Sequence, residues 1–109
     1  MITIDCERPK RLRGQYEFDS CEGLTNWLID AKLPQREINA LIVGVAENGR
    51  YAPLVGHRVL TITGPAHGYQ AKEMARQIGV INTRGKGERY SKDPQKGLEF
   101  ARRIDEGVS

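Results

Sequence analysis

The sequence has no long apolar run, few cysteines and no basic stretch followed by an apolar one in its first residues. No apolar run approaches the roughly 18 residues of a membrane-spanning helix, so we expect no membrane contact. Residues 1–5 do not place a basic stretch before a long apolar one, so we expect no signal peptide and a cytoplasmic protein. The two cysteines, Cys6 and Cys21, are too few for a disulfide framework and predict free thiols in a reducing compartment.

Metal and cofactor sites are not indicated either. The candidate metal ligands are Cys6, Cys21, His57 and His67. Neither the cysteines nor the histidines have the short spacing that puts two ligands on one turn. The segment Gly64–Gly68 separates an expected strand from an expected helix, where phosphates bind, but it matches no glycine-rich fingerprint and Pro65 removes an N–H donor. We therefore expect no cofactor.

A nucleophilic active site is not marked by any motif. Cys21, His57 and Asp93 could supply a nucleophile, a base and an orienting group, but such a trio can be assembled from almost any chain, and no G-x-S-x-G elbow is present. Cys21 lies in the expected first turn of a helix, where the dipole can lower a thiol pKa. A small residue packed under that helix is the simpler interpretation. Asp105 and Glu106 are interpreted as a solvated helix end. The sequence thus predicts a protein that is not an enzyme.

What the sequence does contain predicts one domain over residues 1–109. Its 39% hydrophobic and 28% charged residues are typical of a folded chain. The net charge of +3, from 17 basic and 14 acidic residues, is by itself weak evidence of an anionic partner. The distribution of the cations is more informative than their total.

The first half of the chain predicts a hairpin followed by two helices. Ile2 and Ile4 alternate with polar residues, as do Tyr16 and Phe18, which indicates two strands joined by a basic segment and Gly14. Asp19 or Ser20 can cap the next helix, and Glu22 stands close to a capping-box position. A second helix is expected from about Pro34 to Asn48-Gly49, antiparallel to the first. The two apolar faces are Leu24, Trp27, Leu28 and Ala31, and Ile38, Leu41, Ile42 and Val45.

The second half predicts strand, helix, loop and helix. A strand is expected at 58–63, a third helix ending at Gly79, a short strand at Val80-Ile81, and a glycine-rich basic loop over 82–92. Asp93-Pro94 begins a fourth helix that ends at Gly107. The apolar faces of these helices are Ala71, Met74, Ala75 and Ile78, and Leu98, Phe100, Ala101 and Ile104. The order predicts an α+β fold, in which the N-terminal hairpin and the central strand form a small, mainly antiparallel sheet packed with about four short helices.

Two cation-rich segments are the candidate binding sites. The first contains Arg8, Lys10, Arg11 and Arg13. The second contains Arg84, Lys86, Arg89, Tyr90 and Lys92. Their cations could neutralise phosphates, the glycines of the second segment would let the backbone approach, and its tyrosine could stack on a base. The alternative is two solvated loops without a partner.

Residues 56–68 resemble the KOW motif of ribosomal and transcription-elongation proteins. The matching positions are Gly56, Val59, Ile62, Gly64, Pro65 and Gly68. The resemblance implies a strand, a Gly-Pro turn and a contact surface for RNA or DNA. The sequence departs from the motif at His57, where an acidic residue is usual, and at Ala71, where a second-strand glycine is usual. After Tyr69 its periodicity is helical.

Residues 71–80 resemble the first helix and turn of a helix-turn-helix protein. Ala75 and Gly79 have the expected spacing, and Ile78 and Val80 are apolar as that motif requires. The resemblance implies DNA binding. The sequence departs from it at Gly85, near which the next helix should carry an apolar anchor. An amphipathic helix with a glycine C-cap is the alternative.

A third resemblance covers residues 18–40. The matching residues are Phe18, Asp19, Ser20, Glu22, Leu24, Trp27, Leu28, Ile38, Asn39 and Ala40. They look like a segment of a phage-encoded anti-CRISPR family that inhibits the type I-F surveillance complex. The resemblance implies a small inhibitor that binds a host protein or nucleoprotein surface, and it implies no particular site residue.

Taken together, the sequence favours a small basic binding protein. Its expected partner is nucleic acid, DNA or RNA, or a nucleoprotein complex, contacted through the two cation-rich segments. A phage- or plasmid-type accessory inhibitor that binds a host protein complex is the first alternative, and a small enzyme with an unrecognised site is the second.

Overall fold

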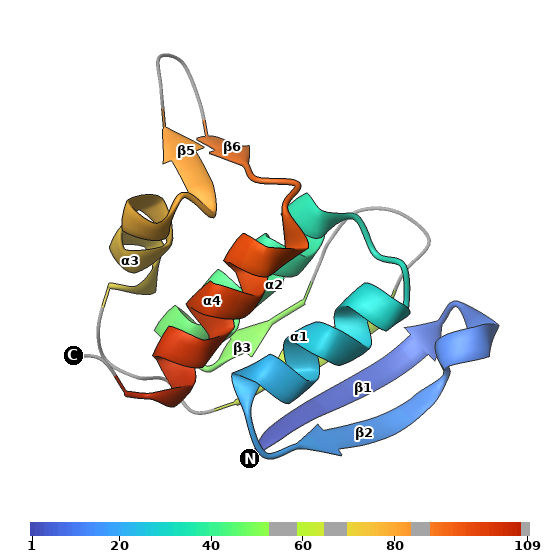
Figure 1. Cartoon of the computed structure of the whole chain (residues 1–109). Helices are drawn as coiled ribbons and strands as arrows, with labels where there is room; N and C mark the ends of the chain where they lie inside the picture. Colours follow the sequence, from blue (N-terminus) through green and yellow to red (C-terminus); the bar gives the residue numbers. More distant parts are fainter. Residues whose placement is uncertain (53–58, 65–69, 84–87, 108–109) are drawn as a thin grey trace.

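Helices pack on one face of an antiparallel sheet, and a second, two-stranded sheet stands apart from the first (Figure 1). The structure is a computed structural model that describes residues 1–52, 59–64, 70–83 and 88–107. The predicted α+β fold class is confirmed.

The main sheet has the strand order β2-β1-β4-β3, and each neighbouring pair is antiparallel. The strands are β1 (Ile2–Arg8), β2 (Gly14–Phe18), β3 (Arg50–Tyr51) and β4 (Val59–Thr63). The predicted N-terminal hairpin is present, with Ile2 opposite Phe18 and Ile4 opposite Tyr16. The sequence analysis missed β3, because two residues are too short to show a period.

Four α-helices are present where apolar periodicity predicted them. They are α1 (Cys21–Asp30), α2 (Gln35–Asn48), α3 (Ala71–Ile78) and α4 (Pro94–Asp105). Gly49 and Gly79 follow α2 and α3 with φ values of 74° and 92°. Glycine adopts this left-handed conformation without a steric penalty, so both residues stop their helices as expected.

Side-chain caps fix the first residues of α1 and α4. Ser20 Oγ accepts a hydrogen bond from the Gly23 N–H at 3.1 Å, and an Asp93 carboxylate oxygen accepts one from the Gln95 N–H at 3.0 Å. Since Ser20 is the N-cap, the capping-box position falls on Gly23. The expected capping role of Glu22 is therefore wrong, and its side chain is used elsewhere.

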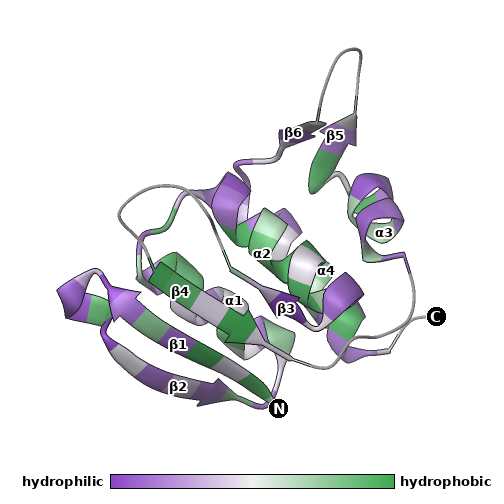
Figure 2. Ribbon diagram, turned by 180° about the vertical axis from the view of Figure 1, so that it is seen from behind, coloured by the Kyte–Doolittle hydropathy of each residue, from purple (hydrophilic) through white to green (hydrophobic). Residues whose placement is uncertain are grey.

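Alternation along the strands gives the main sheet one apolar and one polar face. Ile4, Leu60 and Ile62 are fully buried beneath the helices. Thr3 and Asp5 alternate with them on the opposite side. Figure 2 shows this side in front, with α1 behind the strands. The helices cover one face of the sheet and leave the other uncovered within the described part of the chain.

The second sheet corrects the expected glycine-rich loop over residues 82–92. β5 (Ile81–Thr83) and β6 (Glu88–Tyr90) pair antiparallel, with Ile81 opposite Tyr90. The Ser91 N–H extends the ladder by donating to the Val80 carbonyl oxygen at 2.8 Å. Each of these strands has only three residues, which is too short to show the alternation of apolar and polar residues that marks a strand. The sequence pattern alone therefore indicated a loop.

Helix α2 lies at the centre of the packing. It contacts the other three helices, both β3 and β4 of the main sheet, and β6. Its buried residues are Ile38, Asn39, Leu41, Ile42, Val43, Gly44, Val45 and Ala46. They point in almost every direction around the helix, as expected for a helix enclosed by its neighbours.

Close approach of α2 to β3 requires glycine at position 44. A Cβ there would overlap the ring of Tyr51, so we expect Gly44→Ala to destabilise the protein by about 1–3 kcal/mol. Gly23→Ala in α1 is the matched control, because its Cβ would meet Ser20 Oγ at 3.4 Å and Phe18 at 3.8 Å, which are ordinary contacts. Urea unfolding followed by circular dichroism measures both variants. A Gly44→Ala protein as stable as the Gly23→Ala protein would contradict this packing.

Candidate nucleic-acid interface

The first cation-rich segment forms the end of the β1–β2 hairpin. Arg8 is the last residue of β1, and the 3₁₀ helix η1 (Lys10–Leu12) lies between the strands. We call this end the cationic tip; its residues are Arg8, Lys10, Arg11 and Arg13, all exposed. The sequence analysis therefore brought together four residues that the fold also keeps together.

Hydrogen bonds and ring packing hold the cationic tip against α1. Tyr16 Oη donates to the Leu12 carbonyl oxygen at 2.9 Å, and the Tyr16 ring lies 4.7 Å from the Trp27 ring between centroids. Arg11 Nη2 donates to the Ala31 carbonyl oxygen, just past the last residue of α1, at 2.7 Å. Arg11 thus stabilises the C-terminal end of a helix, a location that favours a cation.

The cations of the tip have no carboxylate partner among the described residues. Arg13 Nε donates to the backbone oxygen of Glu7 at 3.3 Å, and the other cations of the tip form no ion pair there. Three of the helix arginines differ, since each has a glutamate partner, whereas the exposed Arg36 of α2 has none among the described residues. The pairs are Arg76 with Glu73, Arg102 with Glu22 and Arg103 with Glu99. The positive charge of the tip is therefore available to an external anion.

The second cation-rich segment lies on the β5–β6 hairpin and the turn into α4. Arg89 and Lys92 are exposed, and Arg84 and Lys86 lie outside the described residues. Tyr90 is half-buried and packs against the core, so its ring surface is only partly accessible for stacking. Figure 1 shows this hairpin at a different corner of the molecule from η1. The strands β5 and β6 therefore lie apart from the cationic tip.

A buried amide fixes the position of the second segment. Asn39 of α2 is fully buried, and its Nδ2 donates to the Ser91 carbonyl oxygen at 3.0 Å. Its Oδ1 accepts from Gln35 Nε2 at 2.9 Å. Both ends of the amide are satisfied, which removes the cost of burying it. The sequence analysis missed this residue, although an asparagine beside the apolar face of a helix was a usable signal.

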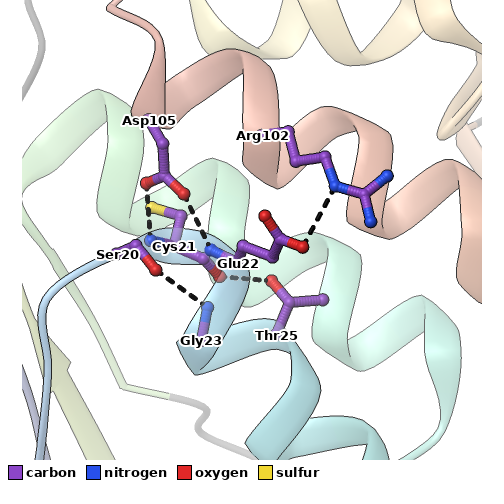
Figure 3. A network of polar contacts seen from close by, with 7 residues as sticks. All are labelled: Ser20, Cys21, Glu22, Gly23, Thr25, Arg102 and Asp105. Carbon is purple, nitrogen blue, oxygen red and sulfur yellow. Dashed lines mark hydrogen bonds and ion pairs between the residues drawn. The ribbon is translucent and has the colours of Figure 1, made fainter.

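A second polar network joins the start of α1 to the end of α4 (Figure 3). The Asp105 carboxylate accepts from the backbone N–H of Cys21 at 2.6 Å and from that of Glu22 at 3.0 Å. Arg102 donates to Glu22 at 3.1 Å alongside it. Asp105 is exposed at the last residue of α4, as interpreted from the sequence, but its carboxylate also has a specific role in the packing. Its carboxylate satisfies two free N–H groups of another helix, a contact between residues far apart in the sequence.

The Cys21 thiol is not activated by its place in the first helical turn. Burial, together with the nearby Asp105 carboxylate, raises its pKa to about 12. The suggested lowering by the helix dipole is thus outweighed, and the interpretation of Cys21 as a small packed residue fits its burial.

The catalytic trio considered from the sequence is not assembled. Asp93 caps one end of α4, whereas Cys21 contacts Asp105 at the other end, roughly 18 Å away at 1.5 Å per residue. His57 lies outside the described residues. Over residues 1–52, 59–64, 70–83 and 88–107, no cluster of three or more His, Cys, Asp or Glu residues could hold a metal ion. No helix in these ranges is long and apolar enough to cross a membrane.

Of the two segments that resemble nucleic-acid motifs, the KOW-like one is described only in part and the helix-turn-helix-like one in full. β4 supplies the strand expected of the KOW-like segment, while Gly56, His57, Pro65 and Gly68 lie outside the described residues. The helix-turn-helix-like segment forms α3 and its glycine cap, after which the chain enters β5 rather than a second helix. Comparisons with protein-family models, curated proteins and solved structures found no match to this chain.

The buried thiol makes stability depend on pH in alkaline solution. The folded state favours the neutral thiol, so this contribution is fully present below the ordinary thiol pKa of 9.0 and is lost as the pH rises toward about 12. We expect Cys21→Ala to flatten the decline of the unfolding free energy over that interval. Urea titrations at several pH values measure this pH dependence of the unfolding free energy. Cys6→Ala is the control, because the Cys6 thiol does not have Asp105 as a neighbour. An unchanged pH dependence in Cys21→Ala would contradict the assignment.

Proposed function

We propose that this protein binds nucleic acid, free or within a nucleoprotein complex, through the cationic tip of the β1–β2 hairpin. The observation that carries the proposal is that exposed arginine and lysine side chains gather there without carboxylate partners among the described residues. Phosphate groups are the anions that such an array neutralises best, because each contact also releases condensed counterions.

The distribution of acidic residues favours nucleic-acid binding at the cationic tip rather than on the uncovered face of the main sheet. Asp5 and Glu17 are exposed on the uncovered side of the hairpin. Their charges would repel a polyanion lying across that face. The described cations of the second hairpin, Arg89 and Lys92, could add a separate contact for a long ligand, because the molecule extends only 37 Å in its longest dimension. About 11 base pairs of B-form DNA cover that length.

Removal of three tip cations tests the proposal. We expect Arg8→Ala, Lys10→Ala and Arg13→Ala, combined, to weaken binding of a labelled duplex of about 20 base pairs. The magnitude of the slope of log affinity against log salt should fall by about 2.7, because each of the three lost phosphate contacts contributes about 0.9. Arg11 is retained because it bonds α1. Fluorescence anisotropy across a series of salt concentrations measures both quantities.

A matched triple variant separates the site from the net charge. Arg76→Ala, Arg102→Ala and Arg103→Ala remove the same charge from residues that already pair with glutamates. This variant should keep a salt slope close to that of the wild type. Equal losses in both triple variants would overturn the tip as the binding site, and no binding of any nucleic acid at low salt would overturn the function.

A further inference from the structure

A row of aromatic side chains begins at the cationic tip. Tyr16 is bonded to the tip at Leu12, and the ring of Trp27 lies 4.7 Å from that of Tyr16 and 6.1 Å from that of Phe18. All three rings are half-buried. They lie at the β2 edge of the main sheet, beyond which no further described strand pairs. Partly exposed ring surface therefore adjoins cations that lack carboxylate partners.

The charges around the Tyr16–Trp27 end of this row suit an anionic chain, whereas the exposed Asp19 follows Phe18 at the other end. The register places Tyr16 opposite Ile4, on the helix-covered side, so Asp5 and Glu17 point to the other side of the sheet. On α1, the exposed Asp30 lies one turn beyond Trp27. The negative charge of Asp30 is offset by two nearby cations. One is Arg11, which donates to the carbonyl oxygen of Ala31, and the other is the exposed Lys32.

We propose that the aromatic row makes this a site for single-stranded nucleic acid. One or two bases would stack on the exposed surface of Trp27 and Tyr16 while the adjoining phosphates contact the cationic tip. Aromatic faces beside a cationic surface are the combination that single-strand binders use, whereas the bases of a duplex are already stacked on one another. The inference rests on the proposed function and specifies its ligand.

Trp27 itself reports the predicted contact. It is the only tryptophan in the chain, so fluorescence excited at a wavelength that the four tyrosines do not absorb follows this residue alone. We expect oligo-dT and oligo-U of about 20 nucleotides to quench the fluorescence and to bind more tightly than a duplex of the same length. The duplex should leave the fluorescence nearly unchanged, because its phosphates can reach the tip without a base entering the aromatic row.

A pair of matched variants tests the stacking. Trp27→Leu keeps an apolar side chain over the core but removes the large aromatic face, and it should weaken single-strand binding roughly 5- to 100-fold. Its binding of duplex should stay within about twofold of the wild type. Tyr51→Leu is the control, since Tyr51 is another half-buried aromatic packed on the core but lies on β3, at the opposite edge of the sheet. It should leave both affinities unchanged.

The outcomes distinguish this inference from the proposed function. Equal affinity for single strand and duplex, with unchanged Trp27 fluorescence, would overturn the stacking site and leave tip binding intact. No binding of either probe at low salt would overturn both. Circular dichroism verifies that Trp27→Leu is folded, and if it is not, the fluorescence of the wild-type protein decides the question.

Discussion

The burial of α2 on nearly every side is the constraint on which the rest of the structure depends. Because apolar residues surround this helix, the main sheet, the other three helices and β6 must all reach it. Gly44 lets β3 lie close to α2. The buried side-chain amide of Asn39 forms hydrogen bonds with the side chain of Gln35 and the carbonyl oxygen of Ser91. With the core filled in this way, the residues of the cationic tip stay exposed outside it.

The cationic tip is ordered by contacts that leave most of its charge unused. Backbone and ring interactions through Leu12, Tyr16 and Trp27 hold the segment against α1. Only Arg11 contributes its guanidinium to the attachment by bonding a carbonyl oxygen at the end of that helix. A preorganised array of cations loses little conformational entropy on binding, so the tip is better suited to a ligand than a loop of the same composition.

Several carboxylates at the helix ends make contacts that stabilise the fold. Asp105 satisfies backbone N–H groups of α1, Asp93 begins α4, and Glu22 pairs with Arg102 across the two helices. The same arrangement keeps the Cys21 thiol protonated, because a buried sulfur beside a carboxylate disfavours the thiolate. Of the groups that sequence analysis weighed as catalytic candidates, Cys21 and Asp93 thus lie at helix ends, and His57 is outside the described residues.

The sequence by itself determined the four helices, their caps and glycine stops, and the N-terminal hairpin, because caps and periods are local properties of a few neighbouring residues. It also located the tip cations, which are adjacent along the chain. Only the tertiary structure decided the strand order, the pairing of β5 with β6, the burial of Asn39 and the capping of α1 by Asp105. These features depend on contacts between residues far apart in the sequence. A local pattern does not encode which distant group will accept a hydrogen bond from a free N–H or pack against an aromatic ring. The same physics separated the two cationic segments and placed Trp27 beside the first.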